Sequence, residues 1–179
     1  MRFSKYAKLG AYHWKQYTDN TKYTRHANKV KDWVKEKQVL DVGAGDGLIT
    51  YLLGAKGIDN EVEGVRLARQ KGVDVIVGDA YAMPYKDLSF TSITMIDVLE
   101  HFDNPKRALR EAHRVLREFL YIATPPKDLV PGKLLDRFHV QEWSPAELKT
   151  LVESQGFELV GDIEVVLENK CMYSKFRKI

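Results

Sequence analysis

Apolar and polar residues alternate along this chain in blocks that predict strands separated by helices. The expected strands are short apolar runs near 38–42, 56–59, 73–77, 92–97 and 118–123. Between them, near 62–71 and 105–116, apolar residues recur at the spacing of one helix face. This alternation predicts a largely parallel sheet with helices on both of its faces.

The last part of the chain predicts one more helix and a pair of strands. Ser144, Pro145 and Glu147 have the order of a helix start, with Ser144 as the N-cap, and Gly156 ends that helix. The two strands that follow are expected at 157–166 and 171–178, joined by a polar turn at 168–170.

The first 38 residues differ in character from the rest. They contain ten Lys or Arg residues against three acids, together with seven aromatic residues, and their pattern predicts helices near 4–17 and 21–36. A basic, aromatic segment can bind nucleic acid or an anionic small substrate. It can equally form amphipathic helices that bury the aromatic rings and leave the lysines in water. We expect a helical lid at 1–37 and a core at 38–179, within a single domain overall.

A glycine-rich turn after the first strand carries the clearest chemical signal. The run Val39–Gly47 passes from apolar residues through Asp41 to glycines at 43, 45 and 47, which favours a ligand close to the backbone. A dinucleotide fingerprint requires a further glycine at position 48, where this chain has Leu48. Asp41 would repel a pyrophosphate and would suit a cation. The loop therefore favours a sulfonium-bearing nucleoside over NAD.

Two more acids follow later strands. Asp59 ends the second expected strand, where a carboxylate can accept both hydroxyls of a ribose. Asp79 ends the third and can accept a hydrogen bond from the exocyclic amine of adenine. Acids at strand ends also serve as helix caps and turn formers, so the interpretation depends on the three acids occurring in this order.

From Val39 to Phe157 the chain resembles the class I S-adenosylmethionine-dependent methyltransferases, of the small-molecule, type 11-like kind. The resemblance rests on the 41–47 loop, Asp59, the 78–80 turn and the segments 93–102 and 104–116. It implies an α/β, Rossmann-like, doubly wound and mostly parallel seven-stranded sheet with a C-terminal antiparallel hairpin. It also implies S-adenosyl-L-methionine as the cofactor.

The resemblance assigns candidate residues to the cofactor and to the lid. Gly43, Ala44 and Gly45 would lie along the methionine part, Asp59 would hold the ribose and Asp79 the adenine. The full set of cofactor candidates is Asp41, Gly43, Ala44, Gly45, Asp59, Asn60, Asp79, Ala80, Asp97 and Val98. The lid and substrate candidates are Tyr12, Trp14 and Arg25, with Arg25 or His26 reaching the cofactor carboxylate.

Two histidines are candidates for acid–base chemistry. A sulfonium methyl is already activated, so its transfer needs alignment above all, and a hydroxyl acceptor gains further from a general base. His101 follows the fourth strand and His139 precedes the late helix, although either can be an ordinary surface or capping histidine. Neither has metal-ligand spacing with Cys171 or with another histidine, so we expect no metal.

The acceptor is expected to be a small molecule. Nucleic-acid amino methyltransferases often carry an Asn-Pro-Pro-Tyr or Asp-Pro-Pro-Tyr motif after the fourth strand, where this chain has Asp97-Val98-Leu99-Glu100. We expect methylation of oxygen rather than nitrogen, because His101 can act as a base. An RNA methyltransferase that uses the basic arm and a non-catalytic cofactor-binding module are the alternatives, and the oligomeric state is not predicted.

Composition adds the expected location. The single Cys171 excludes an internal disulfide, and no apolar run reaches the 18 residues of a membrane span. The N-terminus lacks the apolar core of a signal peptide. We therefore expect a cytoplasmic protein without a membrane partner.

Overall fold

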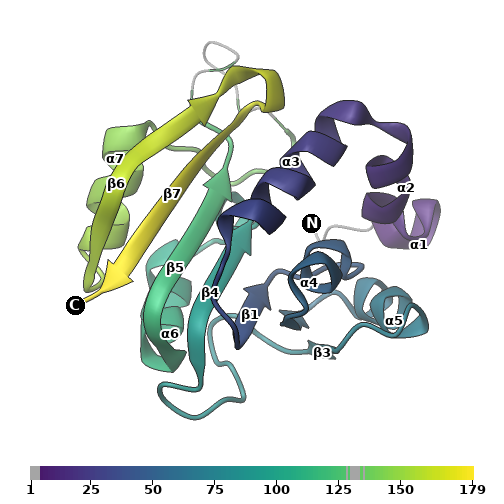
Figure 1. The fold of residues 1–179 in the computed structure, drawn as a ribbon, viewed down its shortest axis with the longest axis horizontal. Helices are drawn as coiled ribbons and strands as arrows, with labels where there is room; N and C mark the ends of the chain where they lie inside the picture. Colours follow the sequence, from purple (N-terminus) through teal and green to yellow (C-terminus); the bar gives the residue numbers. More distant parts are fainter. Residues whose placement is uncertain (1–4, 128, 130–133, 135) are drawn as a thin grey trace.

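A seven-stranded sheet forms the centre of the protein in this computed structural model, which describes residues 5–127, 129, 134 and 136–179 (Figure 1). The strand order is β3-β2-β1-β4-β5-β7-β6, in which β1 to β5 are parallel and β7 lies antiparallel between β5 and β6. The strands are β1 (Val39–Val42), β2 (Lys56–Asp59), β3 (Val75–Val77), β4 (Phe90–Ile96), β5 (Leu116–Thr124), β6 (Phe157–Val166) and β7 (Cys171–Lys178). The predicted fold class is confirmed.

Helices cover both faces of this sheet (Figure 1). They are α1 (Lys5–Leu9), α2 (Tyr12–Asp19), α3 (Thr21–Trp33), α4 (Leu48–Leu53), α5 (Val62–Gln70), α6 (Pro105–Val115) and α7 (Pro145–Glu153), with short 3-10 helices η1 (Leu99–His101) and η2 (Leu167–Asn169). On one face, α6 and α7 pack Leu109 and Leu148 into the larger core. On the other, α3 packs Val30 against Tyr121 and Tyr173.

The sequence explains why these elements form where they do. All four residues of β1 are buried, as expected of a parallel strand covered on both sides. Helix α7 begins with a complete capping box between Ser144 and Glu147, as predicted. Gly156 follows it with φ +88°, a backbone conformation that glycine adopts without strain.

The N-terminal segment differs from the prediction in three respects. The expected helix over 4–17 is two helices, because the chain turns at Gly10, whose φ is +65°. Helix α3 is shorter than expected and ends at Trp33, since Val34 is extended. Moreover, α3 is part of the layered core, with Ala27 and Val30 fully buried. Only α1 and α2 lie beside the sheet rather than on its face (Figure 1).

Right-handed connections bring the carboxyl ends of β1, β2 and β4 to one edge of the sheet. Asp41, Asp59 and Asp97 all lie at that edge. Within the part of the chain that the structure describes, no helix combines the length and the apolarity needed to cross a membrane.

Candidate active site

A cleft of about 1050 Å³ opens at the carboxyl ends of β1, β2 and β4. Its floor is the glycine loop, and Tyr6, His13 and Tyr23 from the N-terminal helices line one wall. Another wall comes from η1 and from residues 138–140. Nine of the predicted site residues line this cleft: Asp41, Gly43, Ala44, Asp59, Asn60, Asp97, Val98, His101 and His139.

The glycine loop is shaped by two close approaches. At Gly43, with φ +81°, a Cβ atom would lie 2.6 Å from the Cβ of Val98. At Gly45, with φ +53°, it would lie 2.0 Å from the hydroxyl oxygen of Tyr6. Both positions therefore require glycine, and at Gly45 the reason is the packing of α1 onto the loop.

Asp41 is buried beneath the loop. Its carboxylate accepts hydrogen bonds from the hydroxyls of Thr50, at 2.7 Å, and Thr94, at 2.8 Å. Burial raises the pKa of Asp41 to about 6, although both hydrogen bonds act to lower it. Asp41 is thus a fixed carboxyl group whose charge depends on pH in the range just below neutrality.

Asp59 is oriented by the backbone on both sides. One oxygen accepts the amide of Gly45 and the other the amide of Glu61, each at 2.7 Å. Burial raises the pKa of this carboxyl group, and the two amides oppose that rise. An acid held rigidly at the end of β2 could hold a ribose.

Asp97 forms an ion pair with His26 of α3. It follows β4 with φ +51°, a conformation that is uncommon for a residue other than glycine. His26 Nε2 lies 3.1 Å from its carboxylate, and 43% of the Asp97 side chain is exposed. Burial acts to raise the pKa of Asp97, but the charge and hydrogen bonding of His26 hold it below its ordinary value. Asp97 correspondingly raises the pKa of His26 against the effect of burial.

Helix α2 is fastened to the glycine loop through Asp46, a residue that sequence reasoning missed. The backbone amide of His13 donates to Asp46 at 2.8 Å, and His13 Nδ1 lies 3.0 Å from the other carboxylate oxygen. The indole of Trp14 donates to the backbone carbonyl of Asp46 at 2.8 Å. The fully buried Asp46 therefore accepts from the first turn of α2, where a helix favours negative charge.

The three lid and substrate candidates have contacts outside the lining of the cleft. Trp14 packs its ring beside Tyr51, with the amine of Lys71 above it. Arg25 pairs at the surface with Glu168 at 3.3 Å. Tyr12, Trp14 and Arg25 are not among the residues that line the cleft, so any role toward a ligand stays a prediction.

Two cofactor candidates also lie outside the cleft lining, at the turn after β3. Asp79 is exposed, and its carboxylate accepts the amide of Tyr81 at 2.8 Å, which is the turn-forming role that the sequence left open. Ala80 lies beside it and packs against the main core. Gly45 does not line the cleft but donates to Asp59. The contact between Asp79 and an adenine stays a prediction.

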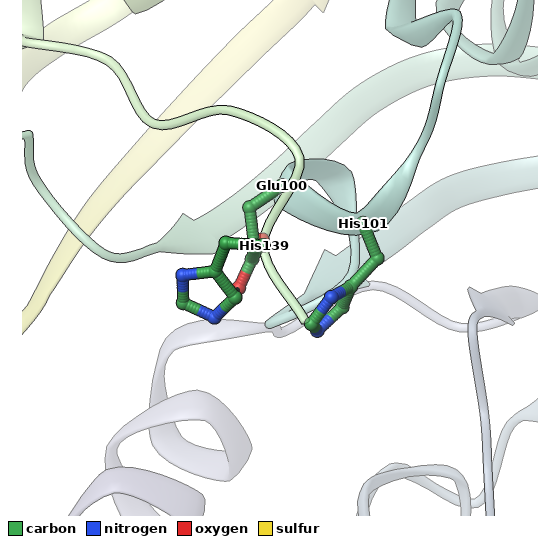
Figure 2. A group of neighbouring side chains, drawn as sticks. All are labelled: Glu100, His101 and His139. Atoms are coloured by element: carbon green, nitrogen blue, oxygen red, sulfur yellow. Dashed lines mark ion pairs between the residues drawn. The ribbon is translucent and has the colours of Figure 1, made fainter. Parts of the chain in front are cut away.

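At the far end of the cleft, Glu100, His101 and His139 meet (Figure 2). One ligand atom of each lies within 4.8 Å of the others. Glu100 and His101 come from η1, and His139 comes from the loop beside it (Figure 2). That loop is held in place because the amide of Val140 donates to the carbonyl of Glu100 at 2.9 Å.

The partners of these three side chains orient them. Glu100 is 1% exposed, and its Oε2 accepts from Thr124 at 2.9 Å. Burial raises its pKa well above the ordinary value. His101 Nδ1 lies 3.0 Å from the carbonyl of Phe138, and burial lowers the pKa of its imidazole. His139 Nδ1 lies 2.5 Å from Glu142.

The lining of the cleft is acidic although the chain as a whole carries +3. Among the described residues that line it, eight are acids: Asp41, Asp46, Asp59, Glu61, Asp97, Glu100, Asp103 and Asp136. Lys5 and Lys170 are the lysines in the same lining. A cleft of this composition favours cationic ligands.

The fold and this cleft together define a doubly wound domain built to bind a nucleoside cofactor at the switch of its strand order. Comparison with known proteins identifies the family. A family model described as a methyltransferase domain matches residues 40–121. The demethylmenaquinone methyltransferase of Thermotoga maritima is 30% identical over 140 residues, which cover 70% of this chain and 61% of that protein. The chain thus spans less than two thirds of that relative's length.

Solved structures share the fold over nearly the whole chain. One is a SAM-dependent methyltransferase of Thermotoga maritima, described as a possible histamine N-methyltransferase, with a TM-score of 0.82, 22% identity and coverage of 97% of this chain and 98% of that one. Another is the magnesium protoporphyrin IX methyltransferase of Synechocystis PCC 6803 with bound SAH, with a TM-score of 0.76, 15% identity and coverage of 98% and 97%. The matched part of the chain, residues 40–121, belongs to the methyltransferase domain family, and the similar structures are those of S-adenosylmethionine-dependent methyltransferases.

Proposed function

We propose that this chain transfers the methyl group of S-adenosylmethionine to an oxygen atom of a small-molecule acceptor. The observation that carries the proposal is the composition of one continuous cleft. Its glycine loop and acids provide a site for a cationic nucleoside, and two oriented histidines stand at its other end.

Each acid in this proposal binds a different part of the cofactor. Asp59, held by two backbone amides, accepts the ribose hydroxyls. Asp97, which carries negative charge and faces the cleft, binds the amino group of the methionine part. The remaining carboxylates favour the sulfonium cation by the same attraction, so the site distinguishes it from a pyrophosphate.

Helices α1 and α2 act as the lid over this cofactor. The clamp between Asp46 and the His13–Trp14 pair supports this role, because it joins α2 directly to the loop that carries the methionine part. Tyr6 lies between the two, with its hydroxyl 3.2 Å from His13 Nδ1. A ligand bound at the glycine loop would therefore also contact α1 and α2.

The histidines activate the acceptor. A neutral imidazole is a suitable proton acceptor, and the lowered pKa of His101 keeps it neutral at physiological pH. The hydroxyl proton leaves, the oxygen lone pair attacks the methyl carbon, and the carbon–sulfur bond breaks to release S-adenosylhomocysteine. Alignment of oxygen, carbon and sulfur supplies most of the acceleration.

A small acceptor fits the charge of the cleft better than RNA does. Of the basic residues in the described part of the N-terminal segment, Lys5 lines the cleft, whereas eight acids line it. Phosphates would be repelled there. The names of the relatives refer to a quinone precursor, to histamine and to a porphyrin, so they do not select one acceptor.

Calorimetric titration tests the cofactor first. We expect S-adenosylmethionine and S-adenosylhomocysteine to bind with micromolar affinity and NAD to give no heat. Asp59→Ala should weaken the binding of both adenosyl compounds, since it removes the carboxylate that accepts the ribose hydroxyls. Unchanged binding by this variant would show that the ribose is held elsewhere.

An acceptor screen with labelled S-adenosylmethionine then tests the reaction. We expect label in phenols or other hydroxyl compounds rather than in amines, with kcat lowered in His101→Asn. His113→Asn is the matched control, because His113 lies away from the cleft and contacts Phe157 and Ile179. Tight cofactor binding without transfer to any acceptor would favour a non-catalytic binding module instead.

A further inference from the structure

We propose that Glu100, His101 and His139 form a binding site for one divalent transition-metal ion at the acceptor end of the cleft. The site departs from the expectation of no metal, which considered only the spacing of residues along the chain. The site itself follows from the geometry below, and its part in the reaction rests on the proposed function.

The first observation is an uncompensated carboxylate oxygen. Glu100 Oε2 accepts from Thr124, but Oε1 has no hydrogen-bond donor among the described residues. The residue is 1% exposed, so this oxygen is buried without a partner. Burying an acceptor in this way is costly unless a donor or a cation satisfies it. Nε2 of His139 lies 4.0 Å from this oxygen.

The second observation is the orientation of both imidazoles. His139 Nδ1 lies 2.5 Å from the Glu142 carboxylate, so it carries the proton and donates it. His101 Nδ1 lies 3.0 Å from the carbonyl of Phe138, which can only accept, so it too is protonated. In a neutral imidazole the lone pair is then on Nε2. Hydrogen bonds from Nδ1 to a carboxylate and to a carbonyl are the usual support of metal-binding histidines.

The distances allow an ion after a small contraction. One nitrogen of each histidine and one Glu100 oxygen lie within 4.8 Å of one another. Bonds of about 2.1 Å to a tetrahedral ion place neighbouring ligand atoms about 3.4 Å apart. Binding would therefore draw the atoms of a pair together by up to roughly 1.4 Å, through rotation of the side chains drawn in Figure 2.

The ligand set indicates the class of metal. Two imidazoles and one carboxylate suit zinc, cobalt, nickel, manganese or iron in the divalent state, whereas magnesium and calcium prefer oxygen ligands alone. Three protein ligands leave at least one position open toward the cleft. The neighbouring acids Asp97 and Glu142 favour the positive charge.

The open position places the ion where the acceptor is proposed to bind. A hydroxyl oxygen on such an ion loses its proton more readily, because the ion stabilises the oxyanion. That proton passes to water, the oxygen attacks the methyl carbon, and sulfur keeps the electron pair of the broken bond. Without the ion, His101 is the proposed base; when the ion is bound, His101 and His139 hold it and the ion activates the hydroxyl in their place.

Titration of the untagged, chelator-treated protein with Zn²⁺ tests the site. We expect one ion per chain, with affinity reduced at least about 10-fold in Glu100→Gln and about 100-fold in His139→Asn. The matched control His113→Asn should bind Zn²⁺ as the unaltered chain does. Co²⁺ in place of Zn²⁺ should give visible absorption that His139→Asn abolishes, which reports direct coordination.

Two results would overturn the proposal: no Zn²⁺ binding by the unaltered chain, or equal binding by the unaltered chain, Glu100→Gln and His139→Asn. Circular dichroism of each variant establishes that it is folded. S-adenosylmethionine titration separates this failure from that of the proposed function, because cofactor binding without Zn²⁺ binding removes the metal site alone. If Zn²⁺ binds and the cofactor does not, the proposed reaction fails and the ion site stands.

Discussion

At the scale of single residues, charge and backbone conformation decide what the cleft can do. At the ends of β1 and β2, Asp41 is buried and Asp59 is half-buried, and removal from water raises the pKa of both carboxyl groups. Asp97 is the exception, since its pKa is held low by His26. Among these three acids of the cleft, one carboxyl group therefore has a lowered pKa and two have raised pKa values. Shifted pKa values of this kind are typical of binding sites rather than of structural cores.

Asp41 should make the stability of the fold fall as pH rises from about 4 to 6. Its pKa is about 6 in the folded protein and about 3.9 in the unfolded chain, so the unfolded chain loses its proton first. Above both pKa values this group lowers the free energy of unfolding by about 3 kcal/mol relative to its value below both. Denaturant unfolding of the unaltered chain and of Asp41→Asn should give curves that converge or cross across this window. A constant difference from pH 3.5 to 7.5 would contradict the buried titration.

Gly45 can be tested against a glycine with the same backbone conformation. Gly45 and Gly54 have φ of +53° and +59°, but a Cβ at Gly54 has no neighbour within 4 Å. Gly54→Ala should lower the free energy of unfolding by about 1 kcal/mol, because alanine is strained in the left-handed backbone conformation. Gly45→Ala should cost more and weaken S-adenosylmethionine binding at least about 10-fold, because it displaces Tyr6. Equal effects of the two variants on cofactor affinity would mean that Tyr6 packing does not shape the loop.

At the scale of elements, the lid is the part whose position the sequence predicts least. Gly10 divides the expected first helix, and α3 joins the core while its Tyr23 lines the cleft. Helix α2 lies at the loop and is held there through the carboxylate and the backbone carbonyl of Asp46 and through the ring of Trp14 beside Tyr51. A short helix with few attachments can open without disturbing the sheet.

Asp46→Asn should therefore loosen the lid selectively. The substitution removes the charge that α2 meets at its first turn, a loss of about 1.5–3 kcal/mol for a hydrogen-bonded charged group. Amide hydrogen exchange should quicken across 5–19 and stay unchanged in β4 and β5. Asn20→Ala, which removes the cap of α3, is the control and should act mainly on 21–33. Uniform acceleration over all elements would indicate global destabilisation instead.

At the scale of the whole molecule, the cleft joins the lid, the sheet and the loop before α7 in one site. A ligand that contacts all three should stabilise the protein as a unit. At 100 times its Kd, S-adenosylmethionine adds about 2.7 kcal/mol. A domain of this size gains roughly 2–4 °C per kcal/mol, so Tm should rise by roughly 5–10 °C.

NAD and Asp59→Ala provide the comparison for this thermal shift. At the same concentration, NAD should leave Tm unchanged, and Asp59→Ala should lose most of the rise with S-adenosylmethionine. An equal shift from NAD would mean that the cleft recognises the adenosine part alone, without the sulfonium.

The fold and the glycine loop could be predicted because their signals are local. Short apolar runs, the capping box at Ser144 and the glycines after β1 each depend on residues within a few positions of one another. Asp79 shows the limit of such reasoning, because the same residue type at a strand end forms a turn with Tyr81. Asp46 was missed because its partners, His13 and Trp14, lie more than thirty residues earlier in the chain.

The sequence by itself therefore determined the class of fold, the glycine loop that we propose as the cofactor site, and the acids at the ends of β1, β2 and β4, since strand order and handedness carry them to one edge. Tertiary structure alone decided which side chains meet across the cleft. His139 reaches Glu100 and His101 only because its loop returns and pairs with the backbone of Glu100. The spacing of these three residues along the chain does not predict that they lie together. Their contact depends on the path of a loop and on the burial of one Glu100 carboxylate oxygen.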